Sequence, residues 1–444
     1  MNVDGHSQDG YGQDGYSEQS GLSSERWRRL LEGDLAAEAQ QAVDRLAGGL
    51  AKLPTGYAQG AQWGAAALDA GRLGQALFWA YRARVTDDAE AADRAVECFD
   101  AASDELVRLP MQPILYAGFL GTAWVGDYLQ EWIFEADDDL ASEDDDNGEI
   151  DAALLKSLTP TTGLWNCDLL KGLVGCGVYA LQRLPRRRAV LCLERIVDHL
   201  AARAVEVGPG VSWPPLAEVD PRVTYRLGLA HGTAGVVAFL AAVCRAGVAT
   251  DRARPLLDQA CAWLLSVLAP GGDVSRCPVR VSPEGDVAPP ALSWCSGSPG
   301  IAAGLLLAAR CCEHRGWETA ALELARAASA SSEDLPDAGF CHGAAGVAHT
   351  FHRMYQATGE PTFAAAARTW LQRLLASQQL DMGETGFFTD PLSPHIGVRP
   401  GGPELQETGG LMRGAAGIGL VLQAAISDEA PDWDRLMLLS VGRD

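Results

Sequence analysis

The chain has 444 residues, of which 48% are hydrophobic, so it holds enough apolar side chains for a large core. Its formal net charge of −23 argues against nucleic acid as a partner, because phosphate binding requires a basic face. The longest uncharged runs, such as Leu227–Cys244, are interrupted by Gly and His, which suits a buried helix better than a transmembrane segment.

The first 25 residues are rich in Gly, Asp, Ser, Gln and Tyr, which predicts a disordered tail ahead of a single domain over residues 26–444. This stretch has neither the basic start nor the apolar run of a secretory signal, so we expect a cytoplasmic protein. We therefore expect the 11 cysteines to be reduced thiols, most of them in the core and a minority with chemical roles.

From residue 26 onward, charged amphipathic helices alternate with strongly apolar ones. The stretches at 88–109, 252–268 and 363–380 have apolar residues at three and four spacing, as amphipathic helices require. The stretches at 236–242 and 301–309 are apolar on all sides, which is typical of buried helices. We expect only short extended segments, within 210–225 and 274–290, where Pro and Gly prevent long helices.

An acidic stretch, Glu135–Asp151, contains no basic residue. Such a run usually forms a solvated, mobile loop, and a docking site for a basic partner is the alternative.

One short pattern, GxxG followed by an apolar helix, recurs along the whole chain. The seven copies begin at Gly71, Gly118, Gly172, Gly232, Gly297, Gly343 and Gly414. Their spacing leaves room for two helices in each unit, and glycines at a helix start allow tight turns and close helix contacts. We therefore predict an all-α fold, an α/α toroid of seven inner and seven outer helices. An open solenoid is the alternative, but it would require polar caps at its ends, which the sequence lacks.

Equivalent positions in the repeats should lie close together in such a ring. The residues directly before each first glycine are Ala70, Ala117, Lys171, His231, Ser296, His342 and Arg413, and one position earlier stand Asp69, Tyr116, Leu170, Ala230, Cys295, Cys341 and Met412. Cysteines and histidines therefore gather at the starts of the inner helices.

Cys295, Cys341 and His342 offer three soft or borderline ligands from consecutive repeats. Zn²⁺ is the ion that such ligands favour, and three protein ligands leave a fourth position open, as in catalytic zinc sites. The spacing alone is not a zinc-finger signature, so the shared register carries this prediction.

Three motifs follow one another within the seven GxxG repeats: LAHGTAG, then SWCSGSPG, then GFCHGAAG. They resemble the motifs of the lanthipeptide cyclases, the lanthionine synthetase C-like or LanC family. The resemblance covers nearly everything from about Arg26 onward. It implies an α/α toroid that binds Zn²⁺ through Cys295, Cys341 and His342. It also places the family's catalytic His at His231 and its catalytic Asp at Asp168, although an Asp near a helix start is commonly a cap.

The resemblance further implies a reaction and its partners. A peptide Cys thiol adds to dehydroalanine or dehydrobutyrine and forms a (methyl)lanthionine thioether ring in a ribosomally made peptide. The partners would be a dehydrated precursor peptide, with leader and core, and the dehydratase and transporter of the same pathway. In this scheme His231 donates a proton to the enolate, and Asp168 orients the imidazole or relays the proton.

The chain also departs from the family pattern. Family members usually carry an Arg four residues before the first zinc-binding Cys and a Tyr just after it, whereas Ala291 and Ser296 stand here. Arg413 and Lys171 are the candidate replacements by register, and Arg413 is the preferred one. Many such cyclases also carry a small inserted domain, for which Asp127–Pro160 and Ala202–Tyr225 are the candidate positions.

Two other functions remain open. Some relatives add glutathione or another small thiol to dehydroamino acids, and the same zinc site would serve that reaction. A non-catalytic peptide-binding scaffold with a structural zinc is the second alternative. A glycosidase on a similar ring is disfavoured, because it would require paired carboxylates at the ring mouth.

Overall fold

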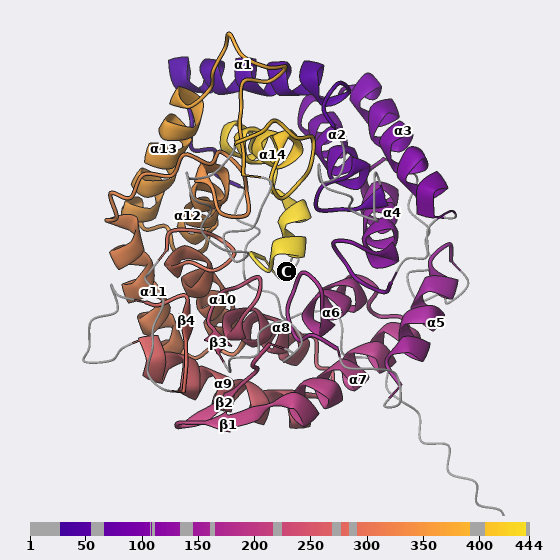
Figure 1. Ribbon diagram of the computed structural model, residues 1–444, viewed down its shortest axis with the longest axis vertical. Coiled ribbons are helices and arrows are strands. Elements are labelled where there is room, and N and C mark those ends of the chain that lie inside the picture. Colours follow the sequence, from indigo (N-terminus) through magenta and orange to yellow (C-terminus); the bar gives the residue numbers. More distant parts are fainter. Residues whose placement is uncertain are drawn as a thin grey trace, which may run out of the picture.

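The computed structural model describes residues 27–54, 66–106, 108, 112–133, 145–159, 165–215, 224–268, 277–283, 291–390 and 405–440. Within these residues, α-helices form two concentric layers around one axis (Figure 1). The inner layer contains α2 (Arg72–Thr86), α4 (Phe119–Trp132), α6 (Leu173–Gln182), α8 (Thr233–Arg245), α10 (Ser298–Cys311), α12 (Ala344–Thr358) and α14 (Ala415–Ile426). The outer layer contains α1 (Gly33–Leu50), α3 (Ala89–Leu106), α5 (Gly148–Ser157), α7 (Arg187–Arg203), α9 (Thr250–Leu268), α11 (Arg315–Ser329) and α13 (Pro361–Ala376). The predicted toroid is confirmed.

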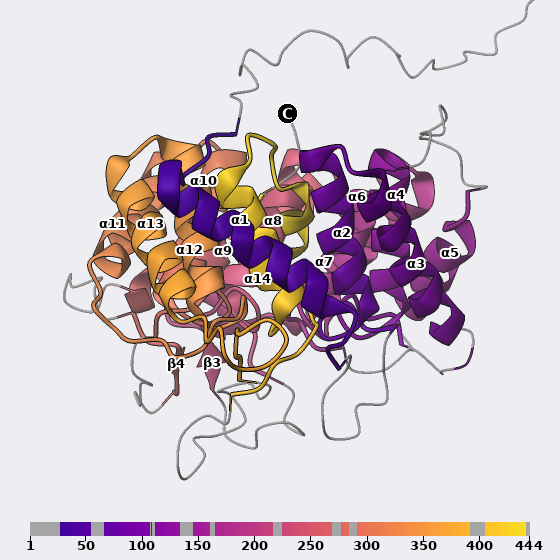
Figure 2. The same cartoon turned by 90° about the horizontal axis from the view of Figure 1, so that it is seen from above.

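The last inner helix closes the ring. α14 packs against both α12 and α2, and α1 crosses its outer side (Figure 2). An open solenoid is therefore excluded. No helix in the described part of the chain has the length and apolarity needed to cross a membrane.

The first glycine of every repeat is the N-cap of an inner helix, from Gly71 before α2 to Gly414 before α14. The reason is steric, as the sixth repeat shows. A Cβ on Gly343 would lie 2.5 Å from the carbonyl oxygen of Asp337, and one on Gly346 would lie 1.7 Å from that of Phe340. The preceding turn passes so close beneath the helix start that a side chain does not fit.

Backbone hydrogen bonds tie these turns to one another around the ring. The N–H of Met412 donates to Asp69, that of Cys341 to Met412 and that of Cys295 to Cys341, over 2.8 to 3.1 Å. The series continues from Ala230 to Cys295 and from Leu169 to Ala230. Residues that share a repeat position therefore meet at one mouth of the toroid.

Short antiparallel strands occur in both segments where the sequence predicts extended structure, and one further strand, β1, lies just before the first segment. β1 (Val205–Val207) pairs with β2 (Gly210–Ser212), and β3 (Tyr225–Arg226) pairs with β4 (Arg280–Val281). The first pair forms a hairpin against α9 within the candidate insert at 202–225, whose residues 216–223 lie outside the described part.

The acidic stretch Glu135–Asp151 is predicted to be a solvated loop, and its described part, residues 145–151, differs from that prediction. Asp145 and Asp151 lie beside the fully buried guanidinium of Arg183, with shortest nitrogen–oxygen distances of 2.6 and 3.0 Å, and Asp127 is a third partner at 2.9 Å. A buried Arg requires carboxylates as partners, so part of the local charge is structural. Residues 135–144, like the predicted tail at 1–25, lie outside the described residues.

The chain after α14 turns into the middle of the ring as the 3₁₀-helix η4 (Asp432–Met437) (Figure 1). The indole N–H of Trp294 donates to the carbonyl oxygen of Met437 over 3.1 Å. His349 and Arg353 from α12 both bind the buried carboxylate of Asp434. Because Trp294 directly precedes Cys295, this segment helps to fix the ring mouth.

Candidate functional site

Cys295, Cys341 and His342 lie together in the turns before α10 and α12. One ligand atom from each residue lies within 4.8 Å of the other two. Both cysteines are buried, and the side chain of His342 is 10% exposed. The hydrogen bond from the Cys295 N–H to the Cys341 carbonyl oxygen, 3.1 Å long, brings the two turns together.

These three residues fit a zinc-like ion. Bonds of about 2.3 Å to sulfur and about 2.0 Å to nitrogen, in tetrahedral arrangement, place the donor atoms roughly 3.5 Å apart, which is within the 4.8 Å limit of the cluster. Neither ring nitrogen of His342 makes a well-directed hydrogen bond with a described residue, although both are buried and Nε2 is in ion-pair contact with Asp337. A buried imidazole without such bonds is costly unless another ligand satisfies it.

The side chains of Cys341 and His342 bind protons tightly. The hydrogen bond with Cys295, together with burial, raises the pKa of the Cys341 thiol well above its usual value. Burial lowers the pKa of His342, but the contacts with Asp337 and Cys295 outweigh this effect and raise it to about 9. An ion that binds here must therefore displace protons.

Asp337 is a residue of this cluster that sequence reasoning missed. Its Oδ2 lies 3.2 Å from His342 Nε2, and its two carboxylate oxygens also accept hydrogen bonds of 2.6 Å from the backbone N–H groups of Gly339 and Asp390. Metal-binding histidines usually contact such a carboxylate, which orients the ring. A carboxylate ahead of a Cys-His pair was the available signal.

Two hydroxyls beside Cys295 were also missed. The Oγ atoms of Ser293 and Ser296 lie 3.7 and 3.6 Å from its Sγ, and both side chains are buried. Ser296, which stands in place of the family Tyr, therefore faces the thiol. Ala291, in place of the family Arg, offers only its backbone carbonyl, which accepts from the Ser298 N–H.

His231 and Asp168 form a second pair at the same mouth. His231 Nδ1 lies 3.0 Å from Asp168 Oδ2. Asp168 Oδ1 accepts a hydrogen bond of 2.7 Å from the Lys171 N–H, so this residue is a cap as well as a partner of the imidazole. Burial raises the pKa of Asp168, but the hydrogen bond and charge of His231, together with the contacts of Lys171, outweigh this effect and lower the pKa. The carboxylate is therefore charged and holds the imidazole in a fixed orientation.

The pair and the cluster are adjacent. The N–H of Ala230, the residue before His231, donates to the Cys295 carbonyl oxygen over 2.9 Å. The side chains of His231 and Asp168 are 14% and 9% exposed, so the pair is largely buried and keeps a small exposed surface at the mouth.

Arg413 reaches the cluster from the other side. Its neighbour Met412 accepts the backbone hydrogen bond of Cys341, and the charge of Arg413 lowers the pKa of the Cys341 thiol, although hydrogen bonding and burial raise it overall. Lys171, the other candidate, is exposed. The charge of Arg413 thus acts on a cluster thiol, whereas the charge of Lys171 lowers the pKa of Asp168.

A double ring of helices with a Cys₂His cluster and a His-Asp pair at one mouth is the arrangement that the resemblance to the lanthipeptide cyclases implies. The family model described as "Lanthionine synthetase C-like protein" matches residues 62–438, so the chain belongs to this family. A lanthionine-type cyclase is the activity that this membership supports.

Solved structures agree on the fold. Nisin cyclase superposes with a TM-score of 0.64 at 15% sequence identity, over 91% of this chain and 96% of that one. An unsaturated glucuronyl hydrolase from Streptococcus agalactiae follows with a TM-score of 0.44 at 13% identity, over 92% and 96% of the two chains, which is too distant to carry an argument. No curated protein sequence matches the chain.

Proposed function

We propose that this chain is a zinc-dependent cyclase that forms (methyl)lanthionine rings in a dehydrated, ribosomally made peptide. The observation that carries the proposal is the short connection between the Cys₂His cluster and the His231–Asp168 pair, through the Ala230–Cys295 hydrogen bond. Such a peptide must come from an enzyme that dehydrates Ser and Thr, so a dehydratase of the same pathway is the expected supplier, and a transporter of the product is the expected consumer.

Zinc held by Cys295, Cys341 and His342 would lower the pKa of a substrate thiol and so favour the nucleophilic thiolate. The substrate sulfur forms a bond to the β-carbon of the dehydroamino acid, whose Cα–Cβ π bond breaks. The electron pair moves to the α-carbon and its carbonyl as an enolate. One proton leaves the thiol and one reaches the α-carbon, so the addition is balanced without an oxidant or reductant.

His231 is the residue that we assign to proton delivery. A protonated imidazole is a suitable general acid near neutral pH, and such help typically contributes a factor of ~10²–10⁴ in rate. Asp168 accepts a hydrogen bond from the Nδ1–H group of His231, which keeps a proton on Nδ1. The charge of the carboxylate also stabilises the imidazolium. Arg413, beside Cys341, is the proposed replacement for the missing family Arg, where its charge favours the ionised cluster.

The test uses a synthetic peptide with one dehydroalanine and one cysteine, incubated with the full-length protein and glutathione. Ring closure removes the alkylatable thiol without changing the peptide mass, and we expect this product only when zinc is present. Treatment with a chelator should abolish it, and added Zn²⁺ should restore it. Glutathione adducts with an intact peptide thiol would instead identify a small-thiol transferase, and unchanged peptide would identify a scaffold.

A further inference from the structure

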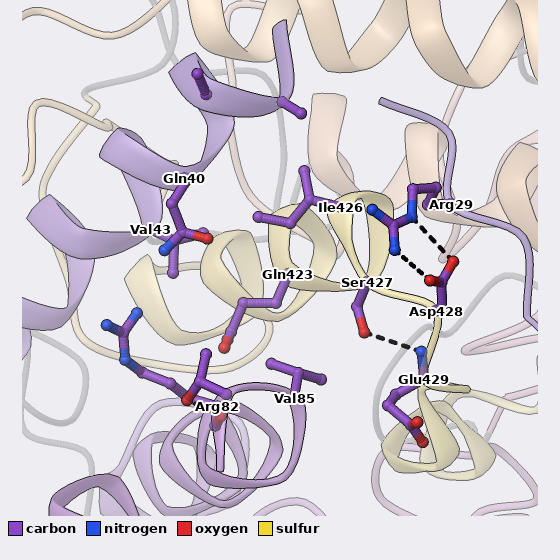
Figure 3. Close-up of a pocket in the computed structure, with 13 residues that line it drawn as sticks. Arg29, Gln40, Val43, Arg82, Val85, Gln423, Ile426, Ser427, Asp428 and Glu429 are labelled. Atoms are coloured by element: carbon purple, nitrogen blue, oxygen red, sulfur yellow. Dashed lines mark hydrogen bonds and ion pairs between the residues drawn. The ribbon is translucent and has the colours of Figure 1, made fainter. Parts of the chain in front are cut away.

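A pocket of about 470 Å³ lies at the seam where the ring closes, between α1, α2 and α14 (Figure 3). It lies at the C-terminal ends of α2 and α14, where Arg82 and Gln423 line it. The metal cluster lies at the opposite ends of the inner helices, beyond Arg413. Because α14 has 12 residues and rises about 1.5 Å per residue, its two ends lie about 18 Å apart. The pocket is therefore separate from the reaction centre.

Gln423 gives this pocket an unmet requirement for hydrogen bonds. Its side chain is 2% exposed, and neither Oε1 nor Nε2 has a hydrogen-bond partner among the described residues. Figure 3 shows this side chain extending from α14 toward Arg82. A buried carboxamide without partners destabilises a protein, so its position at the wall of a cavity favours a ligand that satisfies it.

Arg82 adds unmet donors on the other wall. Its Nη1 is buried and has no partner among the described residues, whereas its Nη2 binds Asp44 Oδ1 over 2.9 Å. An arginine with its Nη1 donors unused is suited to a carboxylate.

The other charged groups of the pocket are already paired. Arg29 binds Asp428, and Glu429 binds Arg84 over 3.1 Å. The hydroxyl of Ser427 accepts a hydrogen bond from the Glu429 N–H over 2.9 Å. The unmet groups are thus Nη1 of Arg82 and the carboxamide of Gln423, which provide several donors and one acceptor.

The remaining wall is aliphatic and contains Ala36, Ala37, Val43, Val85 and Ile426. A carboxylate would satisfy Arg82, a neighbouring amide group would pair with the carboxamide of Gln423, and an aliphatic side chain would contact this wall. The volume falls within the usual range for ligand sites, roughly 300–1,000 Å³.

We propose that this pocket is a second ligand site, which binds a peptide segment that presents a carboxylate beside an amide. The carboxylate comes either from the C-terminus of a peptide or from an acidic side chain. This inference goes beyond the proposed cyclisation and does not depend on the cluster or its metal, so each can fail without the other.

Direct binding to the full-length protein tests the site with three small probes. N-acetyl-L-valine carries a terminal carboxylate, N-acetyl-L-glutamate α-amide carries a side-chain carboxylate, and N-acetyl-L-valine amide carries none. Ligand-observed NMR titration should show saturable binding of at least one of the two carboxylate probes, and the tighter one identifies the source. The neutral amide should bind at least about tenfold more weakly, a difference of about 1.4 kcal/mol.

Two variants and one control localise the binding. Gln423→Leu and Arg82→Met should each weaken the tighter probe about tenfold or more. Arg94→Met removes an arginine of the outer helix α3, outside this pocket, and should leave binding unchanged. Cooperative melting checks that the variants fold. The proposal is wrong if neither carboxylate probe saturates, which would mean that the pocket holds only solvent, or if both variants bind like the parent.

Discussion

The N–H of Cys295 donates a hydrogen bond to the carbonyl oxygen of Cys341, with the two atoms 3.1 Å apart. This bond joins two repeats and brings their thiols to one point. The next bond of the same series, from Ala230 to Cys295, places His231 beside them. One ring of backbone hydrogen bonds therefore positions both the metal ligands and the proposed proton donor.

Asp337→Asn is expected to weaken zinc binding. The carboxylate contacts His342 Nε2, and loss of such a partner typically costs ~10–100-fold in metal affinity. Competition with a chromophoric chelator measures the affinity. Asp334→Asn, which changes an exposed carboxylate nearby, is the matched control. Equal affinities for the two variants would show that Asp337 does not support the metal site.

Arg413→Met is expected to slow cyclisation while the protein retains its zinc, because the charge of Arg413 favours the ionised form of Cys341. Lys171→Met changes an exposed cation at the same repeat position and should have little effect. Initial rates with the synthetic peptide, normalised to zinc content, compare the two. If Arg413→Met is as active as the parent, Arg413 does not replace the family Arg.

The sequence predicted the parts of the site that depend on repeat register. Glycines at fixed helix starts imply equivalent backbones, so Cys295, Cys341 and His231 could be placed at one mouth before any coordinates were known. Asp337 and Ser293 were missed because their roles depend on how a turn folds back on its own helix. The contacts of Arg183 were missed because its partners come from distant segments, and an acidic stretch looks the same whether it is solvated or paired.

Arg183→Met is expected to destabilise the fold strongly. It would leave the carboxylates of Asp127, Asp145 and Asp151 buried or partly buried without their main cation, and breaking such a network typically costs about 3–5 kcal/mol. Arg94→Met, which removes an exposed pair with Glu90 and a contact with the Trp79 ring, should change stability by about 1 kcal/mol or less. Urea unfolding of both variants measures the difference, and similar midpoints would contradict the structural role of Arg183.

Stability is expected to fall as the pH is lowered from about 7 to 5. Burial lowers the pKa of both His349 and His352, although Asp434 partly opposes this effect at His349. Below about pH 6.5 the unfolded chain therefore binds protons that the folded chain does not, which favours unfolding by at most about 1.4 kcal/mol per pH unit for each histidine. In urea unfolding at fixed zinc concentration, His352→Gln should show a weaker pH dependence than the parent. An unchanged dependence would exclude His352 as a contributor.

The division of roles between the cluster and His231 is tested most directly by the His231→Phe variant. Zinc content and the rate of thioether formation are measured on the same preparation, with Cys341→Ala as the comparison. We predict that His231→Phe retains about one zinc per chain and melts like the parent, but closes rings ~10²–10⁴-fold more slowly, whereas Cys341→Ala loses its zinc. A His231→Phe protein that cyclises as fast as the parent, or loses zinc together with activity, would contradict the assignment of proton delivery to His231.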